Sequence, residues 1–150
     1  MRYLLSVIAA LGLAINTDTA TAAEPAKAAE HTTDTLEQVM QAVADGKAVL
    51  IDVRETGEWK AGHLQDAILV PLSKLKREEK KPELAQELSE KLSKDKVVYC
   101  HCRSGGRVLP ASEILKQLGY DVRPLKAGYS DLLKAGFSKA EDAAGEPPAK

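Results

Sequence analysis

The chain has 150 residues, of which 29% are charged, 44% hydrophobic and 4% aromatic, and its formal net charge is −1. This length suits one domain with its own core, and the near-neutral charge argues against a nucleic-acid-binding protein. Two cysteines exclude a disulfide scaffold and a four-cysteine zinc site. No apolar run approaches the ~20 residues of a membrane-spanning helix. The composition therefore predicts a small soluble domain.

The N-terminus has the three-part pattern of a secretory signal peptide. Arg2 supplies a positive charge, an apolar stretch covers residues 4–15, and small residues precede a cleavage site near Ala22 or Ala23. We therefore expect residues 1–23 to be removed on export. This predicts a periplasmic or secreted protein that leaves the membrane after cleavage.

The remaining chain divides into three parts by composition. Residues 24–31 are rich in alanine and are expected to form a flexible lead-in, in which His31 has no predicted role. The globular domain is expected over residues 32–140. Residues 141–150 contain glycine and prolines and are expected to be a disordered tail.

Apolar residues recur at two spacings through the expected domain. Short apolar runs predict buried parallel strands, and one-face apolar stripes predict helices. The expected strands cover residues 48–53, 67–70, 97–100 and 121–125. The expected helices cover residues 36–45, 55–60, 82–92, 110–118 and 130–135, and the basic run 74–81 is expected to be a solvated helix face or connection. This alternation predicts an α/β fold, with a small parallel sheet of about four to five strands and helices on both faces.

Particular residues mark the expected helix ends. Asp34 and Glu37 are three residues apart and predict a capping box at the start of the first helix, and Gly46 predicts its end. Proline is favoured in the first turn of a helix. Pro82 and Pro110 are therefore expected to begin the helices that follow them.

The segment from Cys102 to Arg107 follows the third expected strand, and ligands of open α/β sheets bind beyond the carboxyl ends of strands. Gly105 and Gly106 allow the backbone to curl so that successive N–H groups point inward and form an anion-binding cradle. Arg103 and Arg107 add positive charge, as does the N-terminus of the next helix. These surroundings favour the thiolate of Cys102 as a nucleophile beside an anionic substrate.

The two cysteines admit other interpretations. Cys102 could be an inert residue in a glycine-rich turn. Cys100, His101 and Cys102 could form a metal ligand set, although neighbouring strand residues point to opposite faces. Cys100 and Cys102 could form a redox pair, but their Cα atoms in an extended strand lie ~6.7 Å apart, at the edge of disulfide reach. Cys100 is otherwise a core residue, or a neighbour able to trap oxidised Cys102.

Three stretches of the chain occur in a recognisable order and spacing. The first reads IDVRETGEWKAGHL and continues to AILVPL, within residues 51–72. The second reads VYCHCRSGGR at residues 98–107, and the third reads LKAGYSDLLKAGF at residues 125–137. Together they resemble a single-domain rhodanese, a sulfurtransferase of the rhodanese-like superfamily.

The resemblance implies a persulfide mechanism without a cofactor or a metal. Cys102 would be the nucleophile, taking sulfur from a small anionic donor such as thiosulfate and passing it to cyanide or a thiol. The residues implied to bind the substrate are Arg103, Ser104, Gly105, Gly106 and Arg107. The loop from Cys102 to Arg107 has the six-residue length of sulfurtransferases, whereas related phosphatases use one residue more. A monomer is expected.

Other residues of the first motif have less direct predicted roles. Asp52 and Arg54 are expected to form a structural ion pair close to the site. His63 is expected to be a hydrogen-bonded core residue rather than a base, and Trp59 is expected to pack in the core. Two further functions remain open at this point: a non-catalytic or sulfur-carrier module, and a dithiol redox protein.

Overall fold

The structure is a computed structural model that describes residues 29–141. The predicted signal peptide, residues 24–28 of the predicted lead-in and all but the first residue of the predicted tail lie outside this range. The described elements are, in chain order, α1 (Leu36–Ala44), β1 (Ala48–Asp52), α2 (Thr56–Lys60), β2 (Ala67–Leu69), α3 (Leu72–Glu78), α4 (Pro82–Lys91), β3 (Val97–His101), α5 (Val108–Gln117), β4 (Asp121–Pro124) and α6 (Tyr129–Lys134). The described helices include none that is long and apolar enough to span a bilayer.

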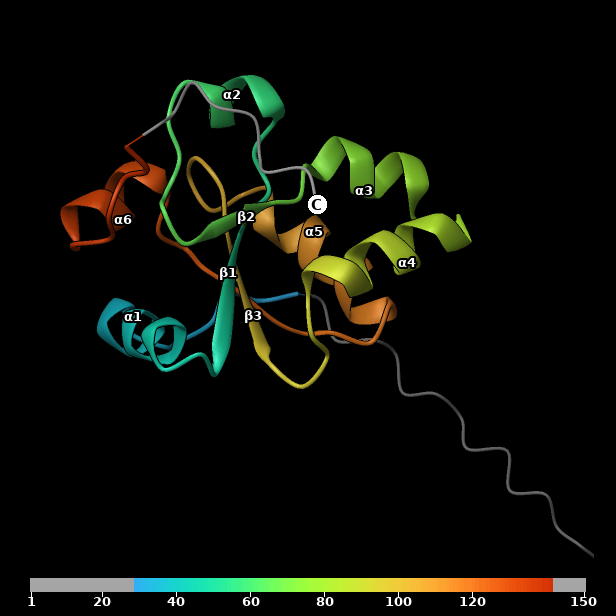
Figure 1. Cartoon of the computed structure of the whole chain (residues 1–150), viewed down its shortest axis with the longest axis horizontal. Helices are drawn as coiled ribbons and strands as arrows, with labels where there is room; N and C mark the ends of the chain where they lie inside the picture. The colour runs from blue at the N-terminus through green and yellow to red at the C-terminus, as the bar shows by residue number, and fades with distance from the viewer. Residues whose placement is uncertain (1–28, 142–150) are drawn as a thin grey trace, which may run out of the picture.

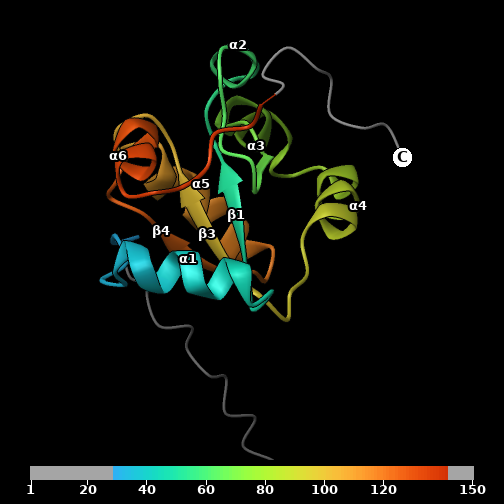
Figure 2. The ribbon, with the colours of Figure 1, turned by 60° about the vertical axis from the view of Figure 1, so that its left-hand side comes forward.

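The strands form one parallel four-stranded sheet in the order β2-β1-β3-β4. In Figure 1, α1 and α6 lie to the left of the sheet, and α3 and α4 lie to the right. Figure 2 shows the same arrangement with α1 brought forward. This is the predicted α/β architecture, with strands joined through helices that cover both faces of the sheet.

Alternating side chains on the central strands divide the core between these two faces. Leu50 of β1 and Tyr99 of β3 pack in one buried cluster with residues of α1 and α6. Ile51 and Cys100, the next residues along each strand, pack in the other cluster with residues of α3, α4 and α5. Because successive strand residues point to opposite faces, the central strands are buried on both sides. This explains their nearly continuous apolar sequence.

The capping box of α1 lies one residue later in the chain than predicted. Thr35 and Gln38 form the box: the Gln38 N–H donates to Thr35 Oγ1 at 3.3 Å, and the Thr35 N–H donates to Gln38 Oε1 at 2.9 Å. The carboxylate of Asp34 instead accepts hydrogen bonds from the Tyr99 hydroxyl at 2.7 Å and from Arg123 at 3.0 Å. The predicted capping residues were therefore wrong, because tertiary partners engage Asp34.

Several element boundaries differ from the predictions by one or two residues. Helix α5 begins at Val108 rather than at Pro110; proline fits here because the first turn of a helix leaves its N–H groups without intrahelical partners. The basic run 74–81 agrees with its prediction as a largely exposed helix face and connection, since residues 74–78 belong to α3, which buries Leu75 against the core. Strand β3 continues to His101, one residue beyond its predicted end. The next residue, Cys102, therefore begins the loop.

Candidate active site

Cys102 lies at the start of the loop that joins β3 to α5, at the carboxyl end of a central strand. Its side chain is buried, and its Sγ accepts a hydrogen bond from the Gly105 N–H at 3.1 Å. Gly105 has a φ of +83°, a conformation that residues with a Cβ rarely adopt. The backbone therefore curls beneath the sulfur as the two glycines predicted. An amide donor of this kind stabilises a thiolate relative to a thiol.

The segment that follows β4 packs directly against the backbone of this loop. A Cβ on Gly128 would lie 1.9 Å from the carbonyl oxygen of Arg103, and one on Gly105 would lie 2.4 Å from that of Lys126. The Tyr129 N–H donates to the carbonyl of Cys102 at 2.9 Å. The third motif of the sequence therefore shapes the loop by packing against it.

Arg107, at the end of the loop, forms a bidentate ion pair with Glu58 of α2. The two guanidinium-to-carboxylate distances are 2.6 and 2.8 Å. The pairing lowers the pKa of Glu58 to about 2 and raises the pKa of Arg107. No local sequence pattern predicts this carboxylate partner, which lies 49 positions from Arg107 in the chain. Arg103 and Ser104, by contrast, are exposed at the start of the loop.

Asp52 and Arg54 form the predicted ion pair beside the loop. Both are buried, and Arg54 Nη2 lies 2.7 Å from Asp52 Oδ2. Arg54 also donates to the carbonyl of Gly62 at 2.8 Å, and its guanidinium lies 4.1 Å from the centre of the Tyr129 ring. Since Tyr129 hydrogen-bonds Cys102, this pair acts on the geometry of the site through packing.

Cys100 and His101 lie on β3 immediately before the loop. Cys100 is fully buried, and its thiol lies 3.9 Å from the carbonyl oxygen of Val108. Burial raises its pKa, as does the nearby Cys102. Burial lowers the pKa of His101, so its ring is neutral around pH 7. Within residues 29–141 no three His, Cys, Asp or Glu side chains are grouped as a metal site would need.

Two aromatic residues of the first motif pack together near α2. The rings of Trp59 and His63 stack with their centres 3.7 Å apart. His63 Nδ1 lies 3.2 Å from the carbonyl oxygen of Trp59. Trp59 is buried and His63 is half-buried. These contacts fit the expected packing and hydrogen-bonding roles.

His31 contacts the loop, although no pattern in the sequence predicts this contact. Its Nε2 lies 2.8 Å from the carbonyl oxygen of Gly105, the residue whose N–H holds the sulfur of Cys102. The two residues are 74 positions apart, and no motif around His31 links them. Sequence spacing alone could not have found this contact.

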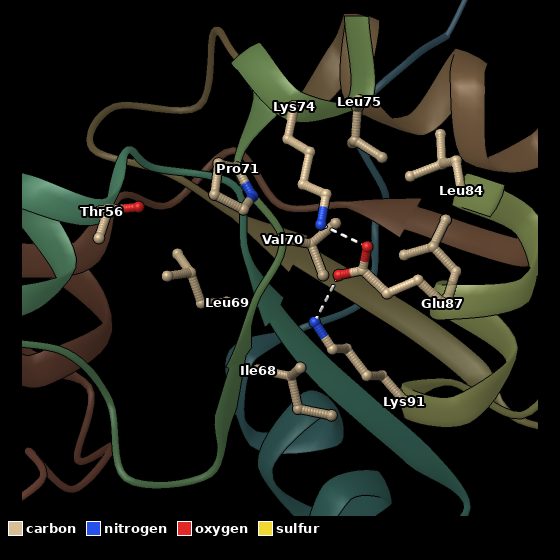
Figure 3. A pocket seen from close by; sticks show the side chains of 11 residues that line it. Thr56, Ile68, Leu69, Val70, Pro71, Lys74, Leu75, Leu84, Glu87 and Lys91 are labelled. Carbon is tan, nitrogen blue, oxygen red and sulfur yellow. Dashed lines mark hydrogen bonds and ion pairs between the residues drawn. The ribbon is translucent and has the colours of Figure 1, made fainter. Parts of the chain in front are cut away.

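A groove of about 350 Å³ lies elsewhere, between the edge strand β2 and helices α3 and α4 (Figure 3). Ile68 and Leu84 line it, and Lys74 and Lys91 reach in from α3 and α4 to bind the two carboxylate oxygens of Glu87. None of the residues that line this groove belongs to the loop at Cys102. The groove is therefore a separate surface feature.

The comparison with known proteins agrees with the observed fold. Residues 35–135 match the family of the rhodanese-like domain. A Schizosaccharomyces pombe protein provisionally named a mitochondrial thiosulfate sulfurtransferase is 39% identical over 83 residues, covering 51% of this chain and 56% of that protein. The Bacillus subtilis protein YqhL is 34% identical over 84 residues, covering 55% of this chain and 59% of that protein. The chain thus spans less than two thirds of the length of these curated relatives.

Solved structures show the same relationship. The human single-domain sulfurtransferase TSTD1 is 30% identical with a TM-score of 0.56, over 66% of this chain and 92% of that one. A Helicobacter pylori protein is 32% identical with a TM-score of 0.53, over 69% of this chain and 87% of that one. The chain belongs to the rhodanese-like domain family.

Proposed function

We propose that this protein is a sulfurtransferase that carries sulfane sulfur as a persulfide on Cys102. The observation that carries the proposal is the hydrogen bond from the Gly105 N–H to the sulfur of Cys102, at the floor of a tightly curled loop. Membership of the family and the likeness to a human sulfurtransferase support the same chemistry.

The proposed reaction has two steps and needs no cofactor. The thiolate of Cys102 attacks the outer sulfur of thiosulfate, forming a new S–S bond while the S–S bond of the donor breaks. The electron pair leaves with sulfite, and Cys102 becomes a persulfide anion. Cyanide or a thiolate then attacks the outer sulfur of the persulfide. Thiocyanate or a new persulfide departs, and the Cys102 thiolate returns.

The charges at the loop favour a small anionic donor. Arg103 is exposed and can turn toward a bound anion, while the N-terminus of α5 adds positive potential. Arg107 is held by Glu58, so we assign it mainly to shaping the loop. The six residues from Cys102 to Arg107 form a loop of sulfurtransferase length, which favours a sulfane group over phosphate.

A single reactive thiol fits the site better than a dithiol. Cys100 is fully buried and burial raises its pKa, so it stays protonated and is a poor nucleophile at neutral pH. Its thiol also faces the carbonyl of Val108. We therefore assign the persulfide to Cys102 and a packing role to Cys100.

Intact-mass spectrometry after treatment with thiosulfate tests the proposal directly. The wild type is expected to gain one sulfur atom, located by peptide mapping at Cys102, and to lose it when cyanide is added. Cys102→Ser should lose thiocyanate formation to background, and Cys100→Ala should keep most of it.

Three results would contradict this assignment. Absence of the added sulfur and of thiocyanate in the wild type would favour a non-catalytic module. Equal loss in both cysteine variants would favour the dithiol interpretation. Hydrolysis of an aryl phosphate by the wild type would favour phosphoryl chemistry instead.

A further inference from the structure

Both polar backbone groups of Gly105 have partners in the structure. Its N–H donates to the sulfur of Cys102 at 3.1 Å, and its carbonyl oxygen lies 2.8 Å from His31 Nε2. Because a carbonyl oxygen can only accept, Nε2 must carry the hydrogen and donate it. The neutral Nε2–H tautomer and the protonated ring can both do this. His31 is therefore a donor to the loop in either state.

This contact determines the direction of the next amide. The described chain has no cis peptide bond, and in a trans peptide the C=O and N–H groups point in opposite directions. Holding the Gly105 carbonyl toward His31 therefore aims the Gly106 N–H away from His31. Within residues 29–141 that N–H has no hydrogen-bond acceptor, so it is available to a bound anion.

The peptide between Gly105 and Gly106 would otherwise reorient easily. Glycine has no Cβ to restrict its backbone, and the space around the Gly106 Cα is open, with no atom within 4 Å of an added Cβ. Packing against Lys126 confines Gly105, but no side chain of the loop itself holds its carbonyl. A donor from outside the loop is thus needed to keep one orientation.

His31 is well placed to serve as that donor because the chain after it is anchored. The Thr32 N–H donates to the carbonyl of Pro124 at 2.8 Å, at the end of β4. Asp34 is held by the Tyr99 hydroxyl and by Arg123. The half-buried His31 ring therefore approaches the loop from a fixed backbone position.

We propose that His31 is a positioning residue that holds the Gly105–Gly106 peptide so that the Gly106 N–H joins the donors around the sulfur of Cys102. The consequence for catalysis rests on the proposed persulfide function. The oriented amide then stabilises both the thiolate and the persulfide anion of Cys102. The segment just before the domain is then part of the active site, rather than a passive lead-in.

Two variants distinguish the effect of the His31 N–H donor from the effect of the shape of its ring. His31→Phe keeps a ring of similar shape and removes the donor, whereas His31→Gln places an amide N–H₂ close to the position of Nε2. The loss of one hydrogen bond predicts that His31→Phe lowers the rate of thiocyanate formation at limiting thiosulfate by about three- to tenfold. His31→Gln should restore most of it. Thr33→Ala, at an exposed neighbour, serves as the control and should match the wild type.

A second measurement does not depend on sulfur transfer. The rate of alkylation of Cys102 by iodoacetamide, followed by peptide mapping, should fall by a similar factor in His31→Phe and recover in His31→Gln. The Gly106 amide resonance in ¹⁵N–¹H spectra should shift in the same pattern. If the wild type transferred no sulfur but these patterns appeared, the proposed function would fail while the role of His31 stood.

Two results would overturn the role of His31. One is a His31→Phe variant that matches the wild type in alkylation rate and in the Gly106 resonance. The other is an equal loss in His31→Phe and His31→Gln, which would assign the effect to the ring rather than to the donor. Thermal unfolding of each variant shows whether the fold is retained, and the amide spectra report the loop itself.

Discussion

Glu58 and Arg107 tie helix α2 to the end of the loop that begins at Cys102. They are 49 residues apart in sequence, and their side chains are each about one third exposed. A bidentate arginine–carboxylate pair combines charge with fixed geometry, so it can hold the direction in which the loop enters α5. Its contribution to stability is modest because water still reaches both groups.

The pH dependence of stability offers a test of this pair. Folding lowers the pKa of Glu58 from 4.5 to about 2, so the pair stabilises the fold fully above pH 4.5. Its contribution is lost as the pH falls from 4.5 toward 2. Glu58→Gln should therefore lower the free energy of unfolding by about 1 kcal/mol at pH 7, and the difference from wild type should shrink at pH 3. Urea unfolding at both pH values measures it.

Glu78→Gln provides the matched control, because Glu78 pairs with an exposed arginine on α3, far along the chain from the loop. It should change stability by a few tenths of a kcal/mol at most. A Glu58→Gln deficit that stayed constant between pH 7 and pH 3 would show that the pair is not the source of the difference.

At the scale of elements, the site depends on two backbone segments in direct contact. The turn that follows β4 lies against the loop that follows β3, and glycine allows the approach at Gly105 and Gly128. Glycine is required at position 128 because a side chain would not fit there. Its φ of −90° is one that any residue can adopt. Any side chain at this position would push the turn away from Arg103.

Gly128→Ala should therefore destabilise the protein and weaken its activity together. A Cβ at 1.9 Å from a carbonyl oxygen forces the two segments apart, and overpacking of this kind costs about 1–3 kcal/mol. The midpoint of urea unfolding and the rate of thiocyanate formation should both fall. Gly57→Ala is the control, because a Cβ there meets no atom within 4 Å and alanine favours the helix. Equal effects of the two substitutions would refute the contact.

At the scale of the whole molecule, the buried sheet places the loop at the carboxyl ends of its central strands. The central strands β1 and β3 pack on both faces, and their carboxyl ends carry Asp52 and the loop at Cys102, respectively. Parallel strands place these ends together. The ion pair of Asp52 with Arg54 and the loop at Cys102 are therefore neighbours because of topology.

Export is a prediction about the whole chain. The pattern of residues 1–23 leads us to expect that the full chain, expressed in a Gram-negative host, accumulates in the periplasm with a new N-terminus near Ala23 or Glu24. Cell fractionation and N-terminal sequencing measure this. Replacing the apolar stretch with polar residues should retain the uncleaved chain in the cytoplasm. Cytoplasmic, uncleaved wild-type chain would contradict the prediction.

Local patterns predicted most of the elements and the tight loop after Cys102. The strands, the short helix around Trp59 and the glycine-rich curl after Cys102 each depend on neighbours in sequence, so their patterns were sufficient. The cap of α1 was predicted one residue too early. Asp34 is as good a capping residue as Thr35 in isolation, and only its contact with Tyr99 and Arg123 decides between them.

The sequence by itself determined the α/β architecture, the position of Cys102 and the tight curl that follows it, because spacing and backbone freedom act over a few residues. The tertiary structure decided what holds that curl in place. Glu58 on Arg107, Gly128 against Arg103 and His31 on Gly105 join segments far apart in the chain. Such contacts depend on how the sheet brings its loops together, and no local pattern encodes them.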